Sequence, residues 1–294
     1  MTETIGLVGL GNAGAALARG FSGQRPLVGH DLDPARAEAV SGCELEWMKS
    51  VVDVADIADT VILSLPRPEA SRNAIAALNN ASCPPKMVIE TSTITPKVAQ
   101  ELSDMCTKMG AGFVDAAIAG GVQTMAEGKV TFLVGGEVHD FERARPVLDL
   151  VAKKIHYLGP VGAGSGIKVV NNAVMHAVMV VLIEAGAMAK KLDVPMSKLV
   201  EILSRPDGMM RPLDHRFRER ILKGDFEGGM SVANARKDSV LALETSQDTG
   251  VPLFATLAAH TPYEIAGQMG LDSLDYAALS KLWEGWCDIK FSDD

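Results

Sequence analysis

The stretch IGLVGLGNAGAALA, residues 5–18, decides the fold of the N-terminal half of the chain. A short apolar run leads into glycines at positions 9, 11 and 14, and a run of alanine and leucine follows them. This order predicts a strand, a tight turn and a helix. Each glycine has a different mechanical role, since Gly9 makes the turn, Gly11 lets a phosphate approach the backbone, and Gly14 lets the helix pack closely against the strand.

A second predicted strand ends in the carboxylate of Asp31, about 20 residues beyond the glycine turn. A carboxylate at that distance binds the adenosine ribose of a dinucleotide and repels a 2′-phosphate. The sequence therefore predicts NAD as the cofactor and NADP as the less favoured form. Arg36 leaves the choice open, because it would meet a 2′-phosphate if Asp31 turned away. The residues expected to bind the dinucleotide phosphates at the helix N-terminus are Gly9, Leu10, Gly11, Asn12, Ala13 and Gly14.

The composition is that of a globular protein with an acidic surface. The 294 residues are 47% hydrophobic and 22% charged, which is enough for two domains with a buried core. A net charge of −9 argues against nucleic acid and membrane partners, and it means that an anionic substrate needs a local basic pocket. The four cysteines are scattered without metal-ligand spacing, so we expect reduced cysteines, a cytoplasmic location and no metal site.

Strand-like and helical segments alternate through residue 160, and beyond Gly166 almost every segment is helical. This pattern predicts an α/β fold: a Rossmann-type, doubly wound, mostly parallel sheet followed by an all-helical domain. We place the dinucleotide-binding domain at residues 1–162 and a helical domain for substrate binding and oligomerisation at residues 163–294. The predicted strands are residues 5–8, 27–31, 60–65, 87–91, 112–116, 130–134 and 155–158. The predicted helices include residues 68–78, 96–109, 140–152, 167–192, 196–203, 212–222, 232–249, 253–269 and 276–283.

Residues 167–192 form the longest predicted helix and link the two domains. Its most apolar part, residues 173–189, is interrupted by His176 and Glu184, so we expect a buried helix and not a membrane span. A small domain cannot cover a helix about 39 Å long from one side. We therefore expect a homodimer or homotetramer whose interface covers it.

Lys168 and Asn172 are the candidate catalytic residues. They are four positions apart, so their side chains project from one face of the long helix. A lysine in the first turn of a buried helix is disfavoured by the macrodipole and by desolvation, which lowers its pKa toward the range that a general acid–base needs. The alternative is a lysine that reaches solvent and an asparagine that satisfies a loop.

Three short segments follow predicted strands at the edge where an open α/β sheet binds its ligand. Gly120 and Gly121 offer free backbone N–H groups that can hold a carboxylate. Leu65-Pro66 and the segment around Thr93 follow two other strands. The alternatives are a simple glycine turn for the first segment and a helix cap for the Thr93 segment.

In their order along the chain, these segments resemble the β-hydroxyacid dehydrogenase family over nearly the whole sequence. The motifs that carry the resemblance are residues 9–14, 65–66, 92–96, 120–121, 162–172 and the later pair at 237–238. The resemblance implies reversible hydride transfer between a nicotinamide and the hydroxyl-bearing carbon of a small anionic hydroxy acid, or the reverse reaction on the matching semialdehyde or aldehyde.

The resemblance also implies roles for single residues. Lys168 would move the hydroxyl proton as general acid and base, and Asn172 would orient the substrate. The residues that would bind the substrate are Ala119, Gly120 and Gly121, and the two glycines would hold its carboxylate. The residues that would line the cofactor channel are Leu65, Pro66 and Thr93, with Lys237 near the nicotinamide.

Two positions depart from the family pattern. Ala119 stands where the family commonly has a serine, and the lost hydroxyl leaves the substrate open. Ala13 replaces a usual methionine and leaves the glycines intact. Two other functions therefore remain: an imine or other carbonyl reductase of the same architecture, which usually lacks the lysine, and a non-catalytic dinucleotide-binding module.

Overall fold

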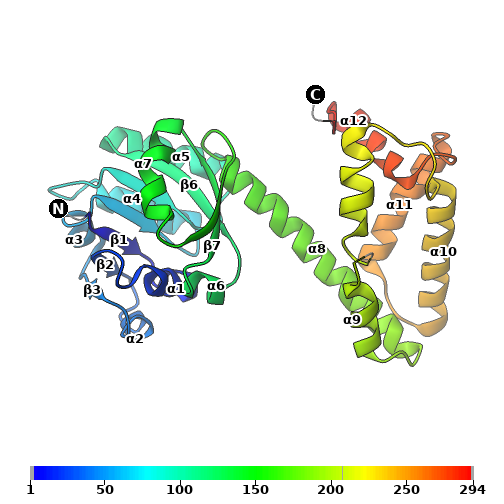
Figure 1. Cartoon of the computed structure of the whole chain (residues 1–294), viewed down its shortest axis with the longest axis horizontal. Helices are drawn as coiled ribbons and strands as arrows, with labels where there is room; N and C mark the ends of the chain where they lie inside the picture. Colours follow the sequence, from blue (N-terminus) through cyan, green and yellow to red (C-terminus); the bar gives the residue numbers. More distant parts are fainter. Residues whose placement is uncertain (1–2, 207, 293–294) are drawn as a thin grey trace. The chain divides into compact units, whose positions relative to one another are not determined.

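The computed structural model describes residues 3–206 and 208–292 (Figure 1). Contacts divide the chain into two compact units, Met1–Ala173 and Val174–Asp294. The helix α8 (Ala163–Lys191) contains the boundary, so its first part belongs to one unit and its second part to the other.

The first unit is built on one eight-stranded sheet with the order β3-β2-β1-β4-β5-β6-β7-β8. Neighbouring strands are parallel except for β6 and β7, which are antiparallel. The prediction of a doubly wound, mostly parallel sheet is therefore confirmed. The strands are β1 (Ile5–Val8), β2 (Leu27–His30), β3 (Leu45–Trp47), β4 (Thr60–Leu63), β5 (Met87–Glu90), β6 (Gly112–Ala119), β7 (Val130–Gly136) and β8 (Ala152–Tyr157).

Seven shorter helices accompany the sheet in the described part of the first unit. They are α1 (Asn12–Phe21), α2 (Arg36–Ala39), α3 (Val51–Ala55), α4 (Pro68–Leu78), α5 (Pro96–Met109), α6 (Val122–Ala126) and α7 (Val138–Leu148). Both α4 and α5 have the predicted bounds, and each begins with proline, which suits the first helical position because the N–H there has no helical partner. The sequence did not predict β3, α2 or α3, because elements of three to five residues show no periodicity.

Helices cover both faces of the sheet, and successive strand residues point to opposite faces. The face that carries Val88 packs against α4 and α5, and the face that carries Ile89 packs against α1 and α7. Strands buried on both sides read as continuous apolar runs, which is why the central strands were recognisable in the sequence.

Helix α8 begins at Ala163, earlier than the start predicted at position 167. The buried carboxylate of Asp115 on β6 accepts hydrogen bonds from the N–H groups of Gly162 (2.8 Å) and Ser165 (2.6 Å), and this caps the helix from a distant strand. Position 164 lies inside the helix and has to be glycine, because a Cβ there would collide with the backbone of β7. The sequence did not predict this early start, because Asp115 and β7 are both distant in sequence from Ala163.

The second unit is helical, as predicted. Its elements are α9 (Met196–Ser204), the π-helix η1 (Pro212–Arg218), the 3₁₀ helix η2 (Ile221–Lys223), α10 (Val232–Thr249), α11 (Phe254–Gln268), the 3₁₀ helix η3 (Tyr276–Leu279) and α12 (Ser280–Cys287). Helices α10 and α11 pack side by side (Figure 1). The single helix predicted over residues 212–222 is instead divided into η1 and η2.

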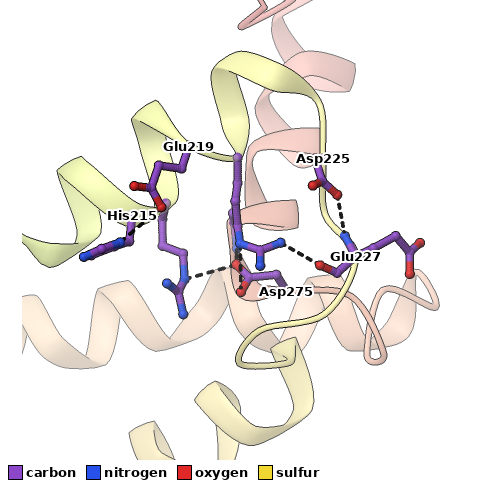
Figure 2. Close-up of polar contacts among 8 residues, drawn as sticks. His215, Glu219, Asp225, Glu227 and Asp275 are labelled. Carbon is purple, nitrogen blue, oxygen red and sulfur yellow. Dashed lines mark hydrogen bonds and ion pairs between the residues drawn. The ribbon is translucent and has the colours of Figure 1, made fainter.

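A buried carboxylate holds these two irregular helices. Asp275 is fully buried, and the guanidinium groups of Arg216 and Arg220 approach it at 3.2 Å and 3.6 Å (Figure 2). Arg216 also lies over the ring of Tyr276, 4.7 Å from its centroid. Arg220 donates a hydrogen bond to the carbonyl oxygen of Glu227 at 2.7 Å. These contacts hold η1 and the loop after η2 against the start of η3.

The apolar side chains of α8 are largely exposed in the single chain, which corrects the expectation of a buried helix. Met179 and Ile183 are 56% and 59% exposed. Among the described residues, α8 is the one helix long and apolar enough to cross a membrane, and its apolar window of 18 residues has a mean hydropathy of 1.7. Glu184 interrupts this stretch, and its carboxylate accepts the N–H groups of Ala255 (2.8 Å) and Thr256 (3.1 Å) at the start of α11. The acidic residue therefore has a capping role inside the second unit.

Candidate functional site

A cavity of about 940 Å³ lies in the first unit, at the carboxyl ends of the central parallel strands. An open α/β sheet binds its ligand at this edge, beside the point between β1 and β4 where the strand order reverses. The volume is near the upper end of the range of about 300–1,000 Å³ that is usual for small-molecule sites. The predicted site residues that line the cavity are Gly9, Gly11, Asn12, Ala13, Asp31, Leu65, Pro66, Thr93, Gly120 and Lys168.

The three glycines of the first turn differ in what a side chain would meet. At Gly9 the backbone φ is +91°, and a Cβ would collide with the carbonyl oxygen of Ser64. At Gly14 a Cβ would collide with the carbonyl oxygen of Gly9. At Gly11 a Cβ would meet no protein atom within 4 Å, although this residue lines the cavity. Folding therefore requires Gly9 and Gly14, whereas Gly11 leaves space that a ligand can fill.

Helix α1 begins directly after this open glycine. Its N-cap is Gly11, and no side chain caps the helix, so the N–H groups of the first turn remain available. Aligned N–H groups and the helix macrodipole favour a phosphate at this place. Leu10 and Gly14 are buried and do not line the cavity. Their part in binding is limited to shaping the turn.

Asp31 lies at the end of β2 and joins the turn to the cavity wall. Its Oδ2 accepts the N–H of Leu10 (2.6 Å), and its Oδ1 accepts the N–H of Asp33 (2.9 Å). A carboxylate has about four acceptor positions, so two remain for ligand hydroxyls. Asp31 is thus fixed in place and still able to bind a ribose.

The charges beside Asp31 are predominantly acidic. Asp33 also lines the cavity, and its carboxylate lies 3.5 Å from the Nε atom of Arg36. Both of these side chains are about half exposed, so the ion pair contributes little stability. Arg36 itself lines the cavity, and its guanidinium already has the Asp33 carboxylate as an anionic partner.

One wall of the cavity is formed by the end of β6. The first four residues of this strand pair with β5, whereas residues 116–119 pair with β7 alone. At the usual rise per residue, β6 extends about 13 Å beyond the pairing with β5. Ile118 within this extension and Gly120 directly after it line the cavity. Ala119 ends the strand and Gly121 caps α6, and neither of them lines the cavity.

Lys168 lines the cavity from the second turn of α8, not from the first turn as predicted. The macrodipole effect falls off within the first turn, so it is not the cause of any large pKa shift here. Burial alone lowers the pKa of the Lys168 amine below its usual value. Asn172 lies one turn further along the same helix, where its Oδ1 is 3.4 Å from the Nδ2 of Asn171, and it does not line the cavity.

Two loops line the cavity after β4 and β5. The N–H of Leu65 donates to the Oγ of Ser92 (2.8 Å), which ties the Leu65-Pro66 loop to the loop that carries Thr93. Thr95 caps α5, since its hydroxyl accepts the N–H of Val98 (3.3 Å). The capping function considered for this segment is therefore confirmed for Thr95, while Thr93 faces the cavity.

Lys237 lies on α10 in the second unit, where its Nζ atom is 2.9 Å from the Oδ1 of Asp238. Lys237 and Asp238 form an ion pair in contact with solvent, because both side chains are more than half exposed. A position of Lys237 near the nicotinamide stays a prediction.

The sequence prediction missed the contribution of α4 to the cavity. Small or polar residues on one face of this helix line it: Ala70, Asn73, Ala74 and Ala77. Their spacing of three, four and seven positions marks one helical face, and this signal was present in the sequence. His30 was also missed; it lines the cavity and its Nδ1 atom lies 3.0 Å from the carbonyl oxygen of Met48.

The cavity has the features that a dinucleotide needs. An open glycine and an uncapped helix N-terminus suit the phosphates, and a fixed carboxylate suits a ribose. A lysine with a lowered pKa supplies a group for proton transfer. In the described part of the chain, no group of three or more His, Cys, Asp or Glu residues is arranged to hold a metal ion.

Two family models match the chain, and the boundary between them lies close to the domain boundary predicted from the sequence. Residues 4–159 match the NAD binding domain of 6-phosphogluconate dehydrogenase. Residues 162–283 match the domain described as NAD-binding of NADP-dependent 3-hydroxyisobutyrate dehydrogenase.

Two named relatives match over most of their length. The 2-(hydroxymethyl)glutarate dehydrogenase of Eubacterium barkeri is 29% identical over 98% of this chain and 97% of its own. The mitochondrial 3-hydroxyisobutyrate dehydrogenase of Homo sapiens is 30% identical over 94% of this chain and 85% of its own.

Solved structures agree with the fold. A 3-hydroxyisobutyrate dehydrogenase of Mycobacterium tuberculosis, solved with L-serine, is 29% identical, with a TM-score of 0.64 over 96% of this chain and 99% of its own. An imine reductase of Myxococcus stipitatus, solved with NADP+, has a TM-score of 0.86 over 95% of this chain and 99% of its own. Because its identity is only 16%, the second likeness concerns the fold alone.

The glycine turn yields a test that separates folding from binding. We expect Gly11→Ala to keep its stability within about 1 kcal/mol, because its φ of −63° suits alanine and the added methyl meets no protein atom. The same variant should bind NADH at least about tenfold more weakly. Thermal unfolding and NADH fluorescence titration measure the two effects. Gly14→Ala is the comparison, and it should lose stability by about 1–3 kcal/mol or fail to fold. Unchanged NADH affinity in Gly11→Ala would contradict the assignment of the phosphates to this turn.

Proposed function

The chain belongs to the β-hydroxyacid dehydrogenase family, and from this premise we propose that it transfers a hydride between NAD and a small β-hydroxy acid or the matching semialdehyde. As a member it is an NAD(P)-dependent oxidoreductase that acts on a CH–OH group. The observation that supports the finer proposal is that Lys168 lines the same cavity as the glycine turn and Asp31.

The proposed reaction needs one proton transfer and one hydride transfer. Bound NAD would supply the hydride acceptor for oxidation and, in its reduced form, the hydride donor for reduction. In oxidation, the neutral Lys168 amine removes the hydroxyl proton of the substrate, and in reduction the ammonium returns it to the carbonyl oxygen. Burial supports this role because it lowers the pKa of the amine, so that a larger fraction is neutral near pH 7. Asn172 would orient the substrate from the next turn of α8.

The substrate class follows from what the relatives have in common. Their names, 3-hydroxyisobutyrate and 2-(hydroxymethyl)glutarate, describe acids in which a hydroxymethyl group is attached to the carbon beside a carboxylate. L-Serine, present in the mycobacterial structure, has the same arrangement. We propose a substrate of this kind, with its carboxylate held by the N–H groups of Gly120 and Gly121. Ala119 offers no hydroxyl to the substrate, so we expect a substituent that needs no hydrogen bond there.

The proposed preference for NAD rests on two carboxylates. Asp31 is oriented by two backbone N–H groups, and Asp33 stands beside Arg36. Both carboxylates would repel a 2′-phosphate, and the guanidinium already has an anionic partner. NAD(P) binding belongs to the whole family, whereas this choice depends on the few residues after β2.

We also propose that the active protein is a homodimer or homotetramer. The second unit buries few large apolar side chains, among them Phe226 and Leu282, and leaves many exposed. Phe254, Leu257 and Trp286 are 76%, 54% and 57% exposed. Exposed apolar surface of this extent is typical of a protein–protein interface, and a second copy would also cover α8.

An imine or carbonyl reductase of the same architecture is the second candidate function. The likeness in fold to an imine reductase supports this function. Lys168 argues against it, because imine reductases of this architecture usually lack the lysine. A dinucleotide-binding module without turnover is the third. A panel of 3-hydroxyisobutyrate, 2-(hydroxymethyl)glutarate, L-serine, the matching aldehydes and a cyclic imine, followed at the NADH absorbance band, distinguishes the three.

Replacement of the lysine tests the chemical step. Lys168→Ala and Lys168→Arg should each lower kcat by about 10²–10⁴-fold and leave the Kd for NADH within about twofold. In the unmodified enzyme, kcat/KM for alcohol oxidation should rise with pH and level off below the usual lysine pKa of about 10.4, because the neutral amine is the active form. The control is Lys108→Ala, an exposed lysine in the last turn of α5. Full activity in Lys168→Ala would exclude the proposed role.

Replacement of the carboxylate tests the cofactor choice. Asp31→Ser should lower the preference for NADH over NADPH by about 10–100-fold, because it removes a charged acceptor for the ribose and a repulsive charge near the 2′-phosphate. Fluorescence titrations with both reduced cofactors measure it without turnover. Asp104→Ser, on the exposed surface of α5, should leave both affinities unchanged. A protein that prefers NADPH before mutation would contradict the assignment of Asp31.

Sedimentation equilibrium tests the assembly. The mass in solution should be two or four times that of the chain at micromolar concentration. Replacing exposed apolar residues of α8, as in Met179→Glu with Ile183→Glu, should dissociate the assembly and leave the first unit folded by circular dichroism. A stable monomer with full activity would show that the exposed surface is not an interface.

A further inference from the structure

Two buried carboxyl groups lie side by side beneath the cavity, and the proposed function uses neither of them. Glu90 on β5 and Asp115 on β6 are register partners of parallel strands, so their side chains point to the same face of the sheet. Both residues are fully buried. Neither forms an ion pair with any residue in the described ranges 3–206 and 208–292. Two adjacent buried anions without a cation are unfavourable, so one of the two groups holds a proton.

The hydrogen bonds identify the charged group. Each oxygen of Asp115 accepts a backbone N–H at the start of α8, from Gly162 and from Ser165. An ionised carboxylate, which only accepts, suits these two donors. The helix N-terminus adds a favourable potential for the negative charge. Asp115 is therefore the anion, although burial raises its pKa and these hydrogen bonds oppose the rise.

Glu90 has the surroundings of a neutral acid. Its Oε1 accepts the N–H of Ser92 at 2.8 Å, while its Oε2 is buried without a hydrogen-bond donor. The hydroxyl of Ser71 on α4, also buried, lies beside the carboxyl group and can accept a hydrogen bond from its O–H. Burial chiefly, and Asp115 in addition, raise the pKa of Glu90. The titratable groups that face Glu90 are Asp115 from β6 and Cys106 from α5. Burial chiefly, and Glu90 in addition, raise the pKa of the Cys106 thiol to about 12.

Glu90 also connects the two loops that line the cavity after β4 and β5. Ser92 bonds to Glu90 through its N–H and interacts with it through its hydroxyl. The same Ser92 Oγ accepts the N–H of Leu65 from the neighbouring loop at 2.8 Å. Ser92, Leu65 and Pro66 all line the cavity. The chain of contacts therefore runs from α4 through Glu90 to both loops.

We propose that Glu90 is a positioning residue that, as a neutral carboxylic acid, fixes the two cavity loops in the geometry that binds the dinucleotide. The inference rests on the proposed function of the cavity. Glu90 touches no ligand in this role and acts through Ser92 and Leu65. A neutral acid can accept on one oxygen and donate on the other, which neither a carboxylate nor an apolar side chain can do.

The protonation state can be tested on the ligand-free protein. Glu90→Gln has the same shape, stays neutral at every pH and keeps an acceptor and a donor. A folded-state pKa above the unfolded value gives stability at low pH that is lost as the pH rises through the folded pKa. Between pH 5 and pH 9, the Tm of the unmodified protein should fall by roughly 2–4 °C relative to Glu90→Gln. Glu142→Gln, on the exposed surface of α7, should follow the unmodified protein. If the Tm of Glu90→Gln and of the unmodified protein changed with pH in the same way, Glu90 would not be a neutral acid.

The positioning role is tested by NADH binding at pH 7. Glu90→Gln should bind within about twofold of the unmodified protein, whereas Glu90→Ala should bind at least about tenfold more weakly. Ser92→Ala breaks the same chain at the loop and serves if Glu90→Ala does not fold. Normal affinity in both alanine variants, or a tenfold loss in Glu90→Gln, would overturn the role. Failure of the unmodified protein to bind NADH would overturn the function of the cavity instead, and the pH measurement would still decide the state of Glu90.

Discussion

The cap that Asp115 places on α8 is the interaction on which the site depends. A buried carboxylate on the sheet binds two N–H groups of the helix and fixes the residue at which the helix begins. An α-helix turns by about 100° per residue, so a start displaced by one position would rotate Lys168 away from the cavity. The position of the candidate acid–base therefore depends on a residue of the sheet that is distant from Lys168 in sequence.

The glycine turn shows how one motif serves two purposes. Gly9 and Gly14 allow the strand, the turn and α1 to approach each other, and a side chain at either position would strike backbone atoms. Gly11 has no such neighbour within the protein. Packing therefore explains Gly9 and Gly14, whereas Gly11 is not required by packing and faces the cavity. A single fingerprint in the sequence conceals this difference, which becomes visible only in the surroundings of each position in the folded chain.

The sequence predicted most of the sheet and much of the cavity because those signals are local. The central strands are apolar runs, and the glycine turn, Asp31 and Leu65-Pro66 each lie at the end of one of them. Buried polar groups were not predictable in the same way. Asp115 finds its partner 47 residues along the chain, and Glu184 finds one of its partners 71 residues away. Such contacts depend on tertiary structure, so the early start of α8 and the role of Glu90 had no local signal.

The antiparallel pairing of β7 has a consequence for how the site can vary. Residues 116–119 of β6 have β7 as their sheet partner and do not pair with β5. The strands that carry the glycine turn and Asp31 lie on the other side of β5 in the sheet. Substitutions at the end of the β6 extension therefore leave the pairing of β5 with β4 and with β6 unchanged. Ala119 ends this extension, so exchanging it would alter the end of β6 without changing the strand pairing that holds the glycine turn and Asp31 in place.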